Sequence, residues 1–232
     1  IGEAVAASVR FDRSQGPFDA SEVGEPDDRL ALGCLRLRGR EGMELRFDVE
    51  EGSQRPIALT VVLGGSSMQL QLFAAPRTLG LWDDIRTEIA AAVSEQGGAV
   101  DEVPGTFGRE LLARLPVRTE DGRTGFQPTR FVGVDGPRWF LRAVFAGAAA
   151  HDAAAAEALE GVLRDVVVVR GAEAMAPREL LALSLPRMAP PPGAQGGEGG
   201  EGGEEQPAQA PADGDRDPLQ PFERGPEITE VR

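Results

Sequence analysis

Apolar and polar residues alternate with a period of two through residues 30–74 of the chain. In MELRFDVE, residues 43–50, every second residue is apolar and all the others are charged. This alternation is typical of a strand with one face buried and the other in water. IALTVVL at 57–63 and MQLQLFA at 68–74 repeat it after short turns, and residues 30–37 predict an earlier strand. Because short turns join neighbouring strands, we expect an antiparallel meander.

Two stretches change to the spacing of an amphipathic helix. The first, residues 80–96, carries one apolar stripe at intervals of three and four residues, formed by Trp82, Ile85, Ile89 and Val93. The second, residues 152–165, begins at Asp152, a residue type that often caps helix N-termini. We therefore expect two main helices, one in each half of the chain.

Strands also precede the second helix. Residues 108–117 and 124–134 predict two of them, and Pro128 marks an edge or a bulge because proline cannot donate to a ladder. After the helix, four consecutive valines at 166–169 favour a short closing strand, since β-branched side chains suit strands better than helices.

The stretch GPRWFLRAVFAG, residues 136–147, can be read as a core strand or as a binding site. As a strand over 138–145 it has one uniformly apolar face, made by Trp139, Leu141, Ala143 and Phe145. Its other face is mixed, because Arg138 and Arg142 alternate there with Phe140 and Val144. The core interpretation explains this order. The alternative is that Arg138 and Arg142, with Arg130, hold an anionic ligand on the mixed face.

These elements predict an α+β fold. We expect a central antiparallel sheet of about six to eight strands in two meanders, packed by the two helices. Residues 1–29 are expected to be a flexible arm, with packing of the arm on the body as the alternative. Residues 30–187 are expected to form a single globular domain. Residues 188–232, rich in Gly, Pro and Glu, predict a disordered acidic tail.

Net charge narrows the classes of partner. The chain carries −14 at pH 7, and such an excess repels nucleic acid and anionic membrane surfaces. With one cysteine it cannot form an internal disulfide, and no apolar run approaches the length of a membrane span. A cytoplasmic protein is the expectation, and self-association stays open.

Residues with catalytic or metal-binding chemistry are scarce. His151 is the only histidine and is expected to face solvent near a helix N-terminus. Cys34 is expected to be a small buried hydrophobe. Asp83 and Asp84 are interpreted as acids at a helix start, and no metal site or cofactor is predicted.

The C-terminal segment 218–232 follows a long polar linker and could dock on a partner through its apolar residues, Leu219, Phe222, Ile228 and Val231. Two functional hypotheses follow. The first is a non-enzymatic protein-binding or scaffold module with disordered arms. The second is a binder of a small anionic ligand, or an enzyme acting on one, through the arginine-bearing sheet face.

Four longer strings resemble a family known only as domain of unknown function 3710. They are GPFDASEV, LQLFAAPRTLGLWDDIRTEIA, GPRWFLRAVFAG and LRDVVVVRG, and the resemblance covers roughly residues 16–187. It implies a cytoplasmic actinobacterial protein and brings no catalytic residues with it. The order of elements is also similar to the Mog1/PsbP sandwich, which implies helices packed on an antiparallel sheet.

Overall fold

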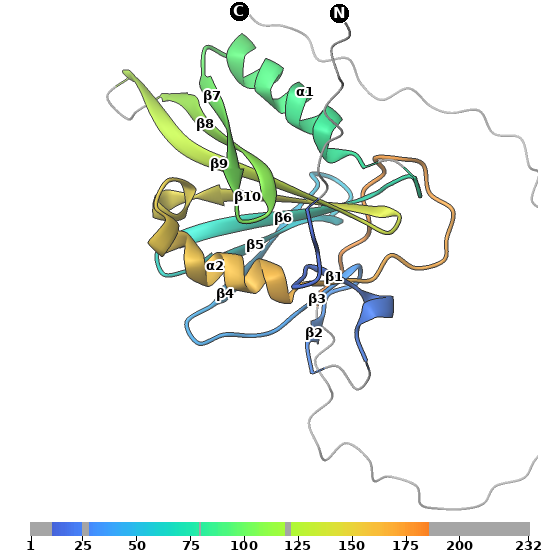
Figure 1. Cartoon of the computed structure of the whole chain (residues 1–232). Helices are drawn as coiled ribbons and strands as arrows, with labels where there is room; N and C mark the ends of the chain where they lie inside the picture. Colours follow the sequence, from blue (N-terminus) through green and yellow to red (C-terminus); the bar gives the residue numbers. More distant parts are fainter. Residues whose placement is uncertain (1–10, 25–27, 79, 119–121, 186–232) are drawn as a thin grey trace, which may run out of the picture. The chain divides into compact units, whose positions relative to one another are not determined.

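Seven strands form one antiparallel sheet in the computed structural model, which describes residues 11–24, 28–78, 80–118 and 122–185 (Figure 1). The strand order is β4-β5-β6-β10-β9-β8-β7. Their bounds are β4 Glu44–Val49, β5 Pro56–Leu63, β6 Ser66–Ala74, β7 Ala99–Gly105, β8 Gly108–Arg118, β9 Thr124–Gly136 and β10 Trp139–Ala146. Two meanders, β4-β5-β6 and β7-β8-β9-β10, therefore meet at β6 and β10, and the predicted fold class is confirmed.

Turn chemistry sets this register. Gly64 and Gly65 both have positive φ, 60° and 77°, which is the conformation of a tight hairpin turn between β5 and β6. The pairing of β9 with β10 ends at Thr129 with Ala146, one residue short of Pro128. Among the described residues Pro128 pairs only with Arg114 of β8, so the predicted edge position is correct.

The two faces of the sheet pack against different helices (Figure 1). Helix α2, Ala153–Asp165, covers the larger core, in which Trp139 and Phe145 are fully buried. The core interpretation of residues 138–145 is confirmed, although the strand itself starts at Trp139. Helix α1, Trp82–Glu95, lies on the opposite face over a much smaller cluster centred on Trp82 and Phe140.

A second sheet of four short strands was not predicted. Its order is β1-β11-β3-β2, with bounds β1 Phe18–Asp19, β2 Leu30–Ala31, β3 Leu35–Leu37 and β11 Val167–Val168. Residues 30–37 are therefore a hairpin and not one strand, because Gly33, at φ 79°, reverses the chain. The closing strand predicted from the valine run is present as β11, parallel to β1 and antiparallel to β3.

The described part of the N-terminal arm, residues 11–24, packs on the body. The amide of Phe18 donates to the carbonyl of Val166 at 2.9 Å, and the indole Nε1 of Trp139 donates to Asp19 at 2.9 Å. The guanidinium of Arg13 lies 5.1 Å from the Trp139 ring centroid. Of the two expectations for the arm, flexible or packed on the body, this segment shows the packed one. It includes the short 3-10 helix Ala20–Glu22.

Strand β7 was also missed, because it is an edge strand with mostly exposed residues and no clear alternation.

A second 3-10 helix, Gly147–Ala150, leads from β10 into α2. After β11, the segment 171–185 pairs with both sheets: Leu181 N donates to Leu72 O at 2.8 Å, and Ser184 N donates to Leu32 O at 3.0 Å. Within the described residues, none of the helices has the length and apolar character needed to cross a bilayer.

Candidate functional site

A groove of about 340 Å³ opens between helix α1 and strands β6 and β10. Its lining combines apolar side chains with three charged ones, and consists of Phe73, Ile85, Glu88, Ile89, Ala92, Phe140, Arg142 and Arg178. Phe73, Ile85 and Ile89 are only partly buried, although they pack against the small core on this face. Helix α1 therefore leaves part of the sheet uncovered beside it.

The groove exists because Trp82 holds α1 toward β8 and β9. Its indole Nε1 donates to the carbonyl of Arg109 at 2.6 Å, and its ring stacks with Phe140 at a centroid distance of 6.1 Å. The ring lies directly over Gly133, where an added Cβ would come within 2.2 Å of it. Glycine at 133 thus permits the close approach that fixes this wall of the groove.

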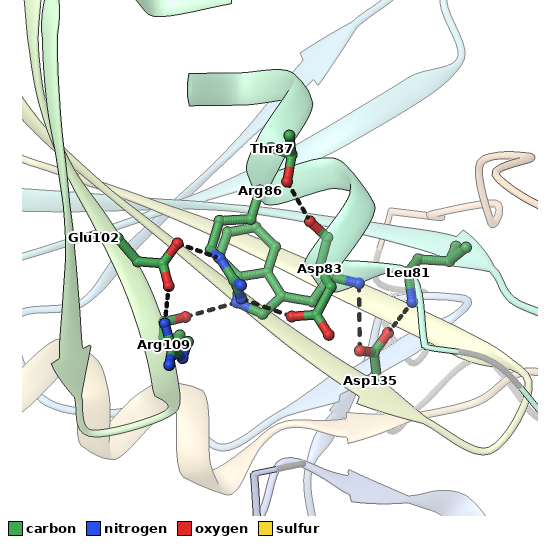
Figure 2. Close-up of polar contacts among 8 residues, drawn as sticks. Leu81, Asp83, Arg86, Thr87, Glu102, Arg109 and Asp135 are labelled. Carbon is green, nitrogen blue, oxygen red and sulfur yellow. Dashed lines mark hydrogen bonds and ion pairs between the residues drawn. The ribbon is translucent and has the colours of Figure 1, made fainter. Parts of the chain in front are cut away.

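The start of α1 is held by a carboxylate from another strand. Leu81, at the N-cap, has no side chain that can cap the helix. Asp135 on β9 replaces that cap, accepting from the amides of Leu81 at 2.7 Å and Trp82 at 3.3 Å (Figure 2). A negative charge at this end also suits the helix dipole.

Arg86 ties the first turns of α1 to strand β7. It donates to Asp83 on its own helix at 2.8 Å and to Glu102 at 3.0 Å (Figure 2). Glu102 also accepts from Arg109 on β8. The hydrogen bond from Arg109 is the main reason why the pKa of Glu102 lies below its ordinary value. Together these contacts attach α1 to β7 and β8.

We predict that Asp135→Ala lowers the free energy of unfolding by about 1–2 kcal/mol, because two helix N–H groups lose their acceptor. Asp84→Ala is the matched control, since it removes an exposed carboxylate from the same end of α1. Urea denaturation of both variants measures the difference. Equal losses would show that charge at the helix start matters and the hydrogen bonds from Leu81 and Trp82 do not.

Arg142 lies on the sheet side of the groove with an incompletely neutralised charge. Its Nη2 donates to the Gln71 side chain, and its guanidinium lies 5.7 Å from the Phe73 ring centroid. Its Nε is buried and has no hydrogen-bond partner among the described residues. Within the same residues, no carboxylate oxygen lies within 4 Å of this guanidinium. Burial lowers the pKa of Arg142, which reflects the cost of holding a cation there.

An ion pair forms the rim of the groove. Arg178, from segment 171–185, donates from Nη1 to both carboxylate oxygens of Glu88 on α1, at 2.8 and 3.0 Å. Both side chains are about half exposed, so this pair is open to water and contributes little to stability. It can therefore rearrange at low cost.

The three arginines proposed to share one face are not brought together. The register pairs Arg130 with Phe145, which places Arg130 on the α2 face, opposite to Arg142. Arg138 lies in the turn between β9 and β10 with φ 61° and donates to the carbonyl of Gly171 at 2.6 Å. Of the three, only Arg142 lines the groove.

Arg130 instead forms a buried ionic network beneath α2. It donates to Glu110 at 2.6 Å and to Glu160 at 2.7 Å, and all three side chains are nearly inaccessible. Glu110 also accepts from the amide of Phe107 at 3.0 Å. Burial works against the charged form of Arg130, but the two glutamates outweigh it and raise its pKa. This network joins β8, β9 and α2. Because Arg130 is engaged by two carboxylates, it is not available to an anionic ligand.

Cys34 and His151 have the environments expected from the sequence. Cys34 is buried, and burial raises the pKa of its thiol to about 12, so that the reactive thiolate is strongly disfavoured. His151 is exposed just before α2. Asp152 caps that helix, accepting from the amides of Ala154 and Ala155.

Some residues that line the groove were singled out from the sequence and others were not. Arg142 was selected because an arginine alternates with apolar residues in its strand. Phe73, Glu88 and Arg178 were missed, because nothing in the local pattern of their three segments indicates that they meet. The proposed docking residues Leu219, Phe222, Ile228 and Val231 lie outside the described residues, as does the whole predicted tail 188–232.

Comparison with known proteins places the chain in a family without assigning it an activity. No curated protein and no solved structure matches the sequence. The similarity to the Mog1/PsbP sandwich therefore stays a prediction. Residues 16–191, more than two thirds of the chain, match the family described as "Protein of unknown function (DUF3710)". The chain belongs to the DUF3710 family.

Proposed function

We propose that this protein binds a small anionic ligand in the groove between α1, β6 and β10, with Arg142 as the group that contacts the anion. The observation that supports this most is the charge of Arg142, which is partly buried and has only the neutral Gln71 as a side-chain acceptor among the described residues. A buried cation without a counter-ion costs free energy. A bound anion would offset that cost through charge-assisted hydrogen bonds.

The remaining features of the groove suit binding more than chemistry. Pockets for small molecules are mostly apolar with a few polar groups that orient the ligand, and this groove has that composition. Its acidic member, Glu88, is engaged by Arg178. The proposal therefore assigns the protein a binding role and no reaction.

The test compares Arg142→Gln with Arg46→Gln in a thermal-shift screen against small anions. Arg46 is a suitable control because it is exposed on β4, and the register places it on the same sheet face. An anion at 100 times its Kd should raise the Tm of the wild type and of Arg46→Gln by roughly 5–10 °C. Arg142→Gln should show no such rise.

Without ligand, Arg142→Gln should be at least as stable as the wild type, because it removes an incompletely compensated charge. A marked fall in its Tm, together with no stabilisation of the wild type by any anion, would mean that Arg142 has a structural role and would reject the proposal. Protein binding through segment 218–232 stays a separate prediction from the sequence.

A further inference from the structure

Resting on this proposed function, we infer that the ligand is an amphipathic monocarboxylate. Its carboxylate contacts Arg142, and its apolar chain or ring lies between α1 and the sheet, against Ile85, Ile89 and Phe73. The argument depends on the order of polar and apolar positions along the groove, on its charges and on the strands that form its floor.

The floor changes from apolar to polar along one direction. In the register of β10 with β6, Phe140 pairs with Phe73, and two residues further on Arg142 pairs with Gln71. Side chains two residues apart on a strand point to the same face and are roughly 7 Å apart. A ligand lying along β10 would therefore first meet the partly exposed ring of Phe73, which packs on the fully buried Phe140, and then a guanidinium beside an amide.

The opposite wall, formed by α1, contributes two isoleucines to the groove. Ile85 and Ile89 are one helical turn apart on α1, and both remain partly exposed although they face the small core. Of the apolar stripe predicted for this helix, Trp82 and Val93 at the two ends are buried, whereas the two isoleucines between them are not. An apolar ligand segment would cover the two isoleucines and complete the burial of the stripe.

The charges favour one negative charge over two. Arg142 is the cation without a carboxylate partner in the groove, whereas Arg178 is already paired with Glu88. A dianionic phosphate monoester would need a second positive charge and would lie in the field of an acidic protein. A planar carboxylate matches the fork of a single guanidinium.

Isothermal titration calorimetry with the full chain tests this inference. The probes are hexanoate, octanoate and decanoate below their micellar concentrations, with decanol, decyl phosphate and inorganic phosphate as comparisons. We expect affinity to rise with each added methylene, by up to roughly fourfold for complete burial. Decanoate should bind at least tenfold more tightly than decanol or decyl phosphate. Arg142→Gln should weaken decanoate binding at least tenfold, while Arg46→Gln should leave it unchanged.

The outcomes separate the two proposals. Binding of inorganic phosphate or of short carboxylates that depends on Arg142 but not on chain length would overturn the amphipathic ligand and leave the anion site intact. Decanoate binding that Arg142→Gln leaves unchanged would overturn both. No binding of any carboxylate probe would overturn the amphipathic ligand, whereas the thermal-shift screen against small anions decides the anion site. The wild-type comparison of decanoate with decanol needs no variant, so the inference stays testable even if Arg142→Gln fails to fold.

Discussion

Replacing Arg130 with methionine is expected to lower the free energy of unfolding by about 3–5 kcal/mol at pH 7, because it leaves two buried glutamates without their cation. Glu110 and Glu160 are 1% and 8% exposed, so water cannot readily replace the guanidinium. Glu110 keeps one donor, the amide of Phe107, whereas the partly exposed Arg164 approaches Glu160 only to 4.0 Å. Chemical denaturation monitored by circular dichroism measures the loss.

The control for this prediction removes the charges as well as the arginine. The triple variant Arg130→Met, Glu110→Gln, Glu160→Gln should recover most of the lost stability, since a neutral buried site no longer carries uncompensated charge. Cation–π contact with the Phe145 ring, 5.0 Å away, is lost in both variants and cancels in the comparison. If the single variant lost less than about 1 kcal/mol, the glutamates would not depend on Arg130 in the way their burial indicates.

Truncating Trp139 to alanine is expected to cost about 3–5 kcal/mol, because the largest fully buried side chain of the described core would be replaced by a cavity. The loss of stability should extend to the N-terminal arm, since Trp139 contacts both Arg13 and Asp19 there. Limited proteolysis should therefore cut near residues 11–24 sooner in Trp139→Ala than in the wild type. Unchanged protection of this segment would show that the pairing of β1 with β11 holds the arm by itself.

The variant Trp139→Phe separates the hydrogen bond from the packing. Burial raises the pKa of the Asp19 carboxyl, but hydrogen bonds from Ser21 and Trp139 and the charge of Arg13 outweigh it, so the pKa lies below its ordinary value of 3.8. The stability contributed by this carboxylate is present above pH 3.8 and is lost as pH falls through the lowered value. Trp139→Phe should weaken that acid dependence, and the comparison variant Asp19→Asn should abolish the part that Asp19 supplies.

Much of the large sheet could be predicted because burial of one face imposes a period of two on strands such as β4 and β6. Met68, Leu70 and Leu72 are buried, and the residues between them are not, as the alternation requires. Both helices also lie close to their expected bounds, because burial of one face imposes the helical spacing of three and four residues on their apolar positions. Strands of two or three residues carry little such signal. The valine run indicated β11, but the pairing that forms the second sheet and the hairpin at Gly33 could not be predicted.

The local pattern of residues therefore predicts most of the long elements and the buried face of β10. How those elements lie relative to one another follows from contacts that form only in the folded chain. The close contact of Trp82 with Gly133 offsets α1 and leaves the groove, and Asp135 caps that helix from a position 54 residues away. The pairing of β9 with β10 decides that Arg130 and Arg142 lie on opposite faces. Local patterns report which side of a segment is buried, whereas a site depends on contacts between segments that are distant in the chain.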